Sequence, residues 1–110
     1  MQQENRNPHR KEKMLDVLHK AASEFIQRES NYDSMITVTR IELSSDLKKA
    51  IVLFTVLPEH KENAAIDFLK RNRSEFRIYV NQKTKIGQMP WFDFQIDNGE
   101  KSRQKIDKII

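Results

Sequence analysis

Basic side chains concentrated in one stretch of the 110-residue chain are the strongest candidates for chemistry. Residues 59–90 hold seven basic and four acidic side chains, and so carry three of the four net positive charges of the sequence. On a helical wheel, Lys70, Arg73 and Arg77 form one row at i, i+3 and i+7, which points away from the apolar face. Cations one helical turn apart can neutralise successive phosphates of a nucleic acid. The candidate nucleic-acid-binding residues are Lys70, Arg71, Arg73, Arg77, Lys83 and Lys85.

The plainer interpretation of such a cluster is a solvated helix face, since most runs of charge serve only solubility. The confinement of the excess to one segment favours nucleic-acid binding, although it does not separate RNA from DNA. Exposed aromatic rings would add stacking contacts to bases. Most phenylalanines fall in apolar periodicities typical of a core. Trp91 fits the open face or the rim of a sheet, and structural packing is its better-supported interpretation.

Residues that could catalyse a reaction or hold a metal are scattered. His9, His19 and His60 fall on different predicted elements, with no histidine or cysteine nearby at ligand spacing. The chain has no cysteine, which excludes a thiolate nucleophile and a cysteine zinc site. Its two glycines provide no loop that could cradle a nucleotide phosphate. We therefore predict no enzyme, no metal site, no cofactor and no small-molecule substrate.

Length and composition favour a single domain spanning residues 1–110, with residues 1–8 expected to be flexible. Apolar residues make up 37% of the chain and charged residues 33%, which is enough apolar material for an ordered, soluble fold. The absence of cysteine suits a reducing cytoplasm. No window approaches the roughly 18 apolar residues that span a bilayer, so we expect no membrane association. We also expect a monomer.

The first half of the sequence predicts a helix followed by a hairpin. Asn7 and Pro8 suit an N-cap and a first helical residue, and apolar residues then repeat at three and four for about five turns. After a polar break, residues 35–43 are β-branched and partly alternating, with a phase change between Val38 and Ile41 that suggests a bulge or a change of covered face. Residues 50–57 form a nearly continuous apolar run of strand length.

The second half predicts two helices, a strand and a short terminal helix. Helical spacing runs from Pro58 to Gly87, but one straight helix would place Asn72 and Lys83 on its apolar face. Two helices meeting near Asn72 explain the pattern better. Alternation then marks a strand over residues 91–96. Next come an Asn98-Gly99 turn and a helix with an isoleucine face, made of Ile106, Ile109 and Ile110. The expected fold is α+β, in the order α-β-β-α-α-β-α, with helices packed on a three-stranded sheet.

The predicted break in the helix pair falls on Asn72, Arg73 and Ser74. Asparagine is among the best N-cap residues, and Glu75 stands three positions on, where a capping box places its acid. We therefore predict that the Asn72 side chain caps the second helix of the pair.

Several motifs in register resemble one known family. Val38-Thr39-Arg40-Ile41-Glu42-Leu43, followed by Ser44-Ser45-Asp46-Leu47 and Ala50-Ile51-Val52, is similar to the hairpin signature of the ribosome-binding factor A family. Residues 65–76 resemble its kinked helix, and residues 89–94 resemble its proline followed by an alternating strand. The likeness covers almost the whole chain, including Ile106 and Ile109 of the closing helix, and implies a type II KH-like fold with a kinked, RNA-facing helix pair.

The resemblance implies a non-catalytic assembly factor that binds the small ribosomal subunit and its rRNA. It also implies help with processing of the rRNA 5′ end and a role in growth in the cold. One departure is clear, because Asn72-Arg73-Ser74 stands where the family usually has Ala-x-Gly at the helix break. Two alternatives stay open: a KH-like module for another RNA or a ribosomal protein, and an interaction domain whose charge serves solubility.

Overall fold

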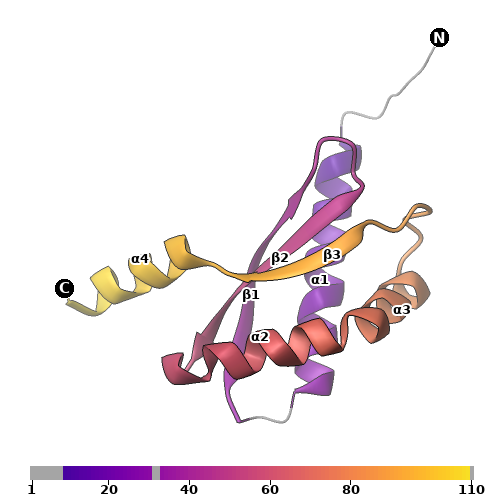
Figure 1. Ribbon diagram of the computed structural model, residues 1–110. Helices are drawn as coiled ribbons and strands as arrows, with labels where there is room; N and C mark the ends of the chain where they lie inside the picture. The colour runs from indigo at the N-terminus through magenta and orange to yellow at the C-terminus, as the bar shows by residue number, and fades with distance from the viewer. Residues whose placement is uncertain (1–8, 31–32, 110) are drawn as a thin grey trace.

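The computed structural model describes residues 9–30 and 33–109 (Figure 1). The expectations for Asn7, Pro8 and a flexible segment 1–8 lie outside these residues. The first helix, α1, spans Arg10–Glu29. One of its faces is buried, as the repeat at three and four predicted, and carries Met14, Leu18, Ala21, Ala22, Phe25 and Ile26.

Three strands form one mixed sheet in the order β1-β2-β3. Strands β1 (Met35–Leu43) and β2 (Lys49–Leu57) pair antiparallel, and β3 (Trp91–Ile96) pairs parallel to β2. The register of β1 against β2 shifts between Val38 and Arg40, which confirms the predicted bulge. The hairpin and the last strand thus lie where the partly alternating segment, the apolar run and the alternating segment placed them.

The segment after β2 is broken twice. A 3-10 turn, η1 (Glu59–Lys61), leads into α2 (Glu62–Arg71), and α3 (Arg73–Lys83) follows after Asn72. The predicted break near Asn72 is confirmed. The helical spacing that continues to Gly87 overstates the length of α3, because the backbone of Thr84 is extended, with φ of −130° and ψ of 170°. The Thr84 hydroxyl and amide both donate to the Val80 carbonyl at this helix end.

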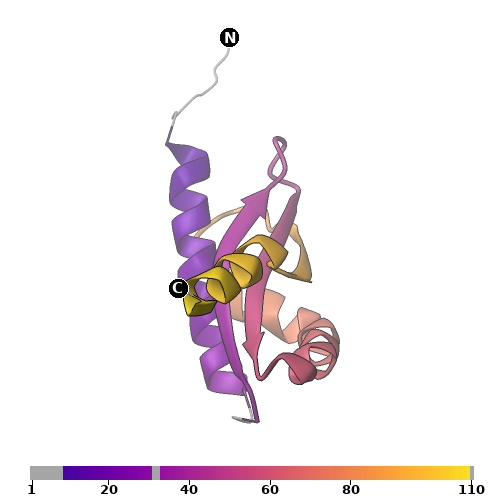
Figure 2. The same cartoon turned by 90° about the vertical axis from the view of Figure 1, so that its left-hand side faces the viewer.

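The helices and the sheet share one apolar core. Phe76 of α3 is 1% exposed, and its ring lies 4.8 Å from that of Phe92, 5.3 Å from that of Phe25 and 5.6 Å from that of Phe94, all measured between centroids. Helix α1 lies behind the sheet in the view of Figure 1, while α2 and α3 lie along its lower end (Figures 1 and 2). One face of β3 therefore points into the core, and the alternate residues of this strand point to the other face.

The last helix, α4 (Asn98–Ile109), projects from the end of β3 on the side opposite α3 (Figure 1). The predicted turn at Asn98-Gly99 is wrong, because both residues belong to the first turn of this helix. Asp97 Oδ1 accepts a hydrogen bond of 3.0 Å from the Glu100 amide, as an N-cap residue does. Ile106, on the expected apolar side, is 57% exposed.

Asp97 ties α4 to the sheet. Its side chain is nearly fully buried, and Oδ2 accepts a hydrogen bond of 2.6 Å from the Thr39 hydroxyl. Arg40 Nε lies 3.4 Å from the same oxygen. The Thr39 hydroxyl and the Glu100 amide lower the pKa of Asp97 below its ordinary value, and Arg40 adds to this against the opposing effect of burial. The ionised carboxylate is thus the form that the fold stabilises.

Asp97→Asn should remove this charge while keeping a good N-cap. A carboxyl whose pKa is depressed by folding adds stability above its unfolded value of about 3.9, and that stability is lost as the pH falls through the folded pKa. We expect the substitution to cost about 2 kcal/mol of unfolding free energy at pH 7 and progressively less below about pH 4. Urea unfolding at several pH values measures this difference, and a variant curve parallel to that of the parent at all pH values would disprove it.

Candidate nucleic-acid interface

The junction between α2 and α3 is built on Asn72, in a manner that the sequence did not predict. The Asn72 Nδ2 amide donates to the Phe68 carbonyl at 2.8 Å, and no side-chain hydrogen bond caps the first turn of α3. Asn72 therefore satisfies the C-terminal end of α2, and the predicted capping box with Glu75 is wrong. Its φ of −100° and ψ of 17° differ enough from helical values to change the direction of the chain.

Two substitutions at Asn72 distinguish these two kinds of cap. Asn72→Ala should cost about 1 kcal/mol of unfolding free energy through loss of the bond to Phe68. Asn72→Asp should cost at least as much, because a carboxylate cannot donate and is repelled by the negative end of α2. If Asn72 capped α3 instead, aspartate would serve as well as asparagine. Urea unfolding of both variants tests this, and a neutral Asn72→Asp would contradict the observed hydrogen bond.

Arg73 bridges from the start of α3 to β3. Its guanidinium Cζ lies 4.6 Å from the centre of the Trp91 ring, and Nη2 lies 3.3 Å from Asp93 Oδ1. The Arg73 side chain is only 27% exposed and that of Asp93 26%. The wheel placed Arg73 in a solvent-facing row with Lys70 and Arg77, whereas the structure turns it onto the sheet edge. The break in the helix is the reason, since a wheel continued through Asn72 does not describe α3.

Three other predicted cations remain exposed around the junction. Lys70 and Arg71 end α2, and Arg77 lies one turn into α3, where it lines a shallow hollow with Ser74 and Met89. Within the described part of the chain, none of these three forms an ion pair with a carboxylate. Unpaired cations on a helical surface are the groups that phosphates neutralise.

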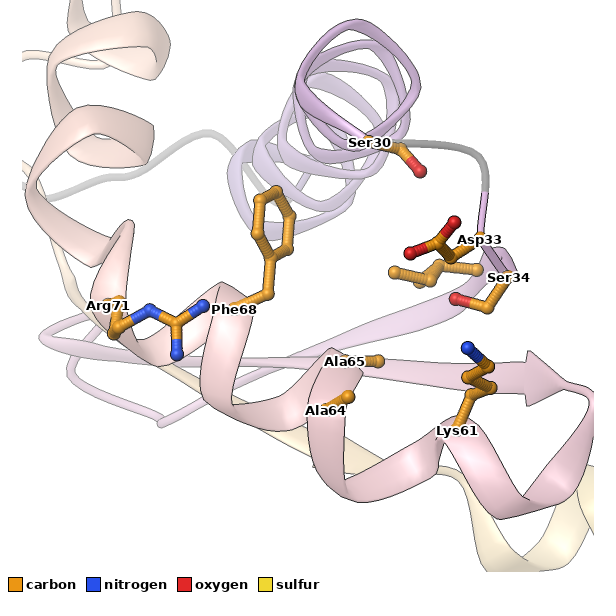
Figure 3. A pocket seen from close by; sticks show the side chains of 9 residues that line it. Ser30, Asp33, Ser34, Lys61, Ala64, Ala65, Phe68 and Arg71 are labelled. Carbon is orange, nitrogen blue, oxygen red and sulfur yellow. The ribbon is translucent and has the colours of Figure 1, made fainter.

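Arg71 points toward a second hollow of about 170 Å³ between α2 and the segment that follows α1 (Figure 3). Phe68 forms part of its wall, and Lys61 reaches into it from η1 toward Ser34. Asp33 also lines this hollow, so its charge is mixed. An open hollow with cations at both ends suits a contact to a phosphate backbone better than it suits an enclosed small molecule.

Lys83 and Lys85 leave the row and serve two other surfaces. The Lys83 ammonium lies 5.7 Å from the centre of the Tyr79 ring, which Arg28 of α1 approaches at 5.3 Å. Lys85 lines a hollow of about 510 Å³ between α1 and the β1–β2 turn, together with Arg10 and Lys13. The structure thus divides the predicted set into a central group at the junction and two outlying positions.

Sequence reasoning missed the contribution of residues distant in the chain. Arg10 and Lys13 precede Lys85 by more than 70 positions, and nothing in their spacing indicated that the three share a hollow. The sequence pattern does indicate the position of Trp91 and Asp93. These two residues alternate with the two core phenylalanines of β3, and this alternation places both on the face away from the core.

Among the described residues, no group of three histidine, cysteine, aspartate or glutamate side chains could hold a metal ion. No helix in the same ranges is long and apolar enough to cross a membrane.

The element order, the mixed three-stranded sheet and the broken helix pair beside these cations define a KH-like α+β domain. The family model described as ribosome-binding factor A matches residues 10–110. The chain is 30% identical over 105 residues to ribosome-binding factor A of Natranaerobius thermophilus, covering 92% of this chain and 79% of that protein. It is 30% identical over 109 residues to the same factor of Polynucleobacter necessarius, covering 94% and 86%.

Solved structures agree on the fold. The crystal structure of ribosome-binding factor A from Thermus thermophilus matches with a TM-score of 0.71 and 22% identity, over 78% of this chain and 93% of that chain. A homology model of the Thermus thermophilus factor, fitted into the cryo-EM map of its 30S complex, matches with a TM-score of 0.65 and 22% identity, over 74% and 88%. The chain belongs to the ribosome-binding factor A family.

Proposed function

We propose that this protein binds the small ribosomal subunit through its rRNA and assists maturation of the subunit, including processing of the rRNA 5′ end. The observation that carries the proposal is the group of cations at the α2–α3 junction, Lys70, Arg71 and Arg77, which form no ion pair within the described ranges. Membership of the family supports the small subunit as the partner of this surface, since a homology model of the Thermus thermophilus relative was fitted into the map of a 30S complex.

The mode of action follows from the chemistry of the surface. Cations without carboxylate partners bind phosphates by releasing counterions, which positions the protein on structured RNA without choosing a base sequence. Such contacts hold rRNA in one conformation and cut nothing. In this proposal the protein is therefore a non-catalytic factor, and a separate nuclease cleaves the rRNA. The proposal also takes the protein to act as a monomer in the cytoplasm.

A strain that lacks the protein tests the proposal. Sucrose gradients of its lysate should show fewer complete ribosomes and an excess of free small subunits, and 5′-end mapping should find unprocessed small-subunit rRNA. Restoring the intact gene should correct both defects, whereas a gene carrying Lys70→Glu and Arg77→Glu should correct neither. Normal gradients and a normal rRNA 5′ end in the deletion strain would disprove the proposal and favour a KH-like module for another RNA or for a ribosomal protein.

A further inference from the structure

Trp91 is an exposed aromatic ring in an unusual position. It begins β3 and is 54% exposed, while its strand neighbours Phe92 and Phe94 are buried in the core. Large aromatic side chains in a stable domain are normally buried. A half-exposed indole on a sheet face therefore lacks part of the stabilising free energy that full burial of its apolar surface would contribute. The Arg73 guanidinium packs on the Trp91 ring, with its Cζ 4.6 Å from the ring centre.

Arg73 is fixed in place against this ring. Asp93, two residues along the same strand and on the same face, accepts from Arg73 Nη2 at 3.3 Å. The arrangement leaves Arg73 Nε buried without a hydrogen-bond partner among the described residues. A buried donor without an acceptor is destabilising, so stability alone does not favour this arrangement. What the arrangement does achieve is a planar cation held 4.6 Å from the centre of the indole.

Further cations flank the ring from the neighbouring strand. Lys49 of β2 is the registered partner of Trp91 across the sheet, and the Trp91 amide donates to the Lys48 carbonyl at 2.8 Å. Both lysine side chains are exposed, and neither forms an ion pair in the part of the chain that the structure describes. Lys49 therefore lies beside Trp91 on the same face of the sheet, and Lys48 precedes it in the chain. An aromatic ring with cations nearby matches a nucleotide, which joins a flat base to charged backbone phosphates.

We propose that Trp91, backed by Arg73 and flanked by Lys48 and Lys49, is a stacking site for one unpaired base of a single-stranded RNA segment. The proposal rests on the proposed function, and it adds a contact that phosphate-binding cations cannot make. Stacking tolerates any base, because every base has a π face. The site therefore selects for an unstacked nucleotide rather than for a sequence, and it would direct the protein to a loop, bulge or end of the rRNA.

The chain contains one tryptophan, so selectively excited tryptophan emission reports on this site alone. We expect a single-stranded oligouridylate of about 12 nucleotides, added to the intact protein at low salt, to quench the emission by more than about half at saturation, because bases stack on the ring. Inorganic polyphosphate, which offers phosphates without bases, should quench it little. Fluorescence anisotropy of a labelled oligouridylate measures binding independently of the tryptophan.

Trp91→Leu should weaken oligouridylate binding by roughly 10-fold, within the range found when a stacking ring is removed. Ile106→Ala is the matched control, since Ile106 is similarly exposed but lies on α4, and it should leave binding unchanged. Oligouridylate that binds without quenching, or that binds Trp91→Leu as tightly as the parent, would overturn the stacking site while the proposed function stood. Quenching by ribosomal proteins alone would assign the ring to a protein contact and would also overturn it. Failure of the proposed function would instead appear as normal ribosome profiles in the deletion strain.

Discussion

Changing Lys70 and Arg77 together to glutamate is expected to weaken binding to the small ribosomal subunit by about 100-fold near 0.1 M salt. Each neutralised phosphate contributes roughly tenfold to the binding constant at that salt concentration, because its counterions are released. Both side chains are exposed and have no ion-pair partner among the described residues, so the folded protein loses no ion pair when they change. Titration of small subunits with labelled protein measures the effect.

The control for this pair carries the same change in net charge. Lys11→Glu and Lys20→Glu lie on exposed positions of α1, away from the α2–α3 junction, and should weaken binding far less. The slope of the salt dependence should also fall by about two units for the junction pair. Both doubly substituted proteins should keep an unfolding free energy within about 1 kcal/mol of the parent, as surface variants generally do. Equal losses in the two proteins would show that only net charge matters and would contradict a localised interface.

Phe76→Ala is expected to have the largest effect on stability. The Phe76 ring joins α1, α3 and β3 through three aromatic contacts, and its removal leaves a cavity that a packed core cannot close. The expected cost is about 3–5 kcal/mol of unfolding free energy, which approaches the total stability of a small domain. Urea unfolding followed by circular dichroism measures this cost.

Ile78→Ala provides the comparison on the same helix. Ile78 is half-exposed, so its truncation should change the unfolding free energy by no more than about 0.5 kcal/mol. A loss below about 1 kcal/mol for Phe76→Ala would mean that the α3 helix does not depend on the shared core. The orientation of the cations on that helix would then lack its structural basis.

The strands and the helix break could be predicted from the sequence because each rests on local periodicity. Residues 91–96 alternate throughout and residues 35–43 alternate in part, and the structure has strands with these bounds. The break follows because an uninterrupted helix would bury Asn72 and Lys83. Which helix Asn72 caps was not predictable. An asparagine can accept or donate, and only the positions of the neighbouring carbonyls decide between the two.

The candidate site was predictable in composition but not in arrangement. A helical wheel continued through Asn72 placed Arg73 beside Arg77, whereas the change of direction at the junction turns Arg73 onto Trp91 and Asp93. That contact joins residues about 20 positions apart, and no periodicity reports it. The start of the terminal helix was wrongly predicted for a similar reason. Asn98-Gly99 is a typical hairpin-turn sequence, but here the buried Asp97 caps a helix that begins at Asn98.

Sedimentation of the purified protein with purified ribosomal subunits measures whether it binds the small subunit selectively. We expect the protein to sediment with small subunits and not with large subunits or bulk RNA. We also expect the binding constant to fall with salt at a log–log slope of magnitude about 3 to 6, corresponding to four to six neutralised phosphates. Salt-independent binding, or equal binding to both subunits, would contradict the claim that the cations of the α2–α3 junction bind small-subunit rRNA.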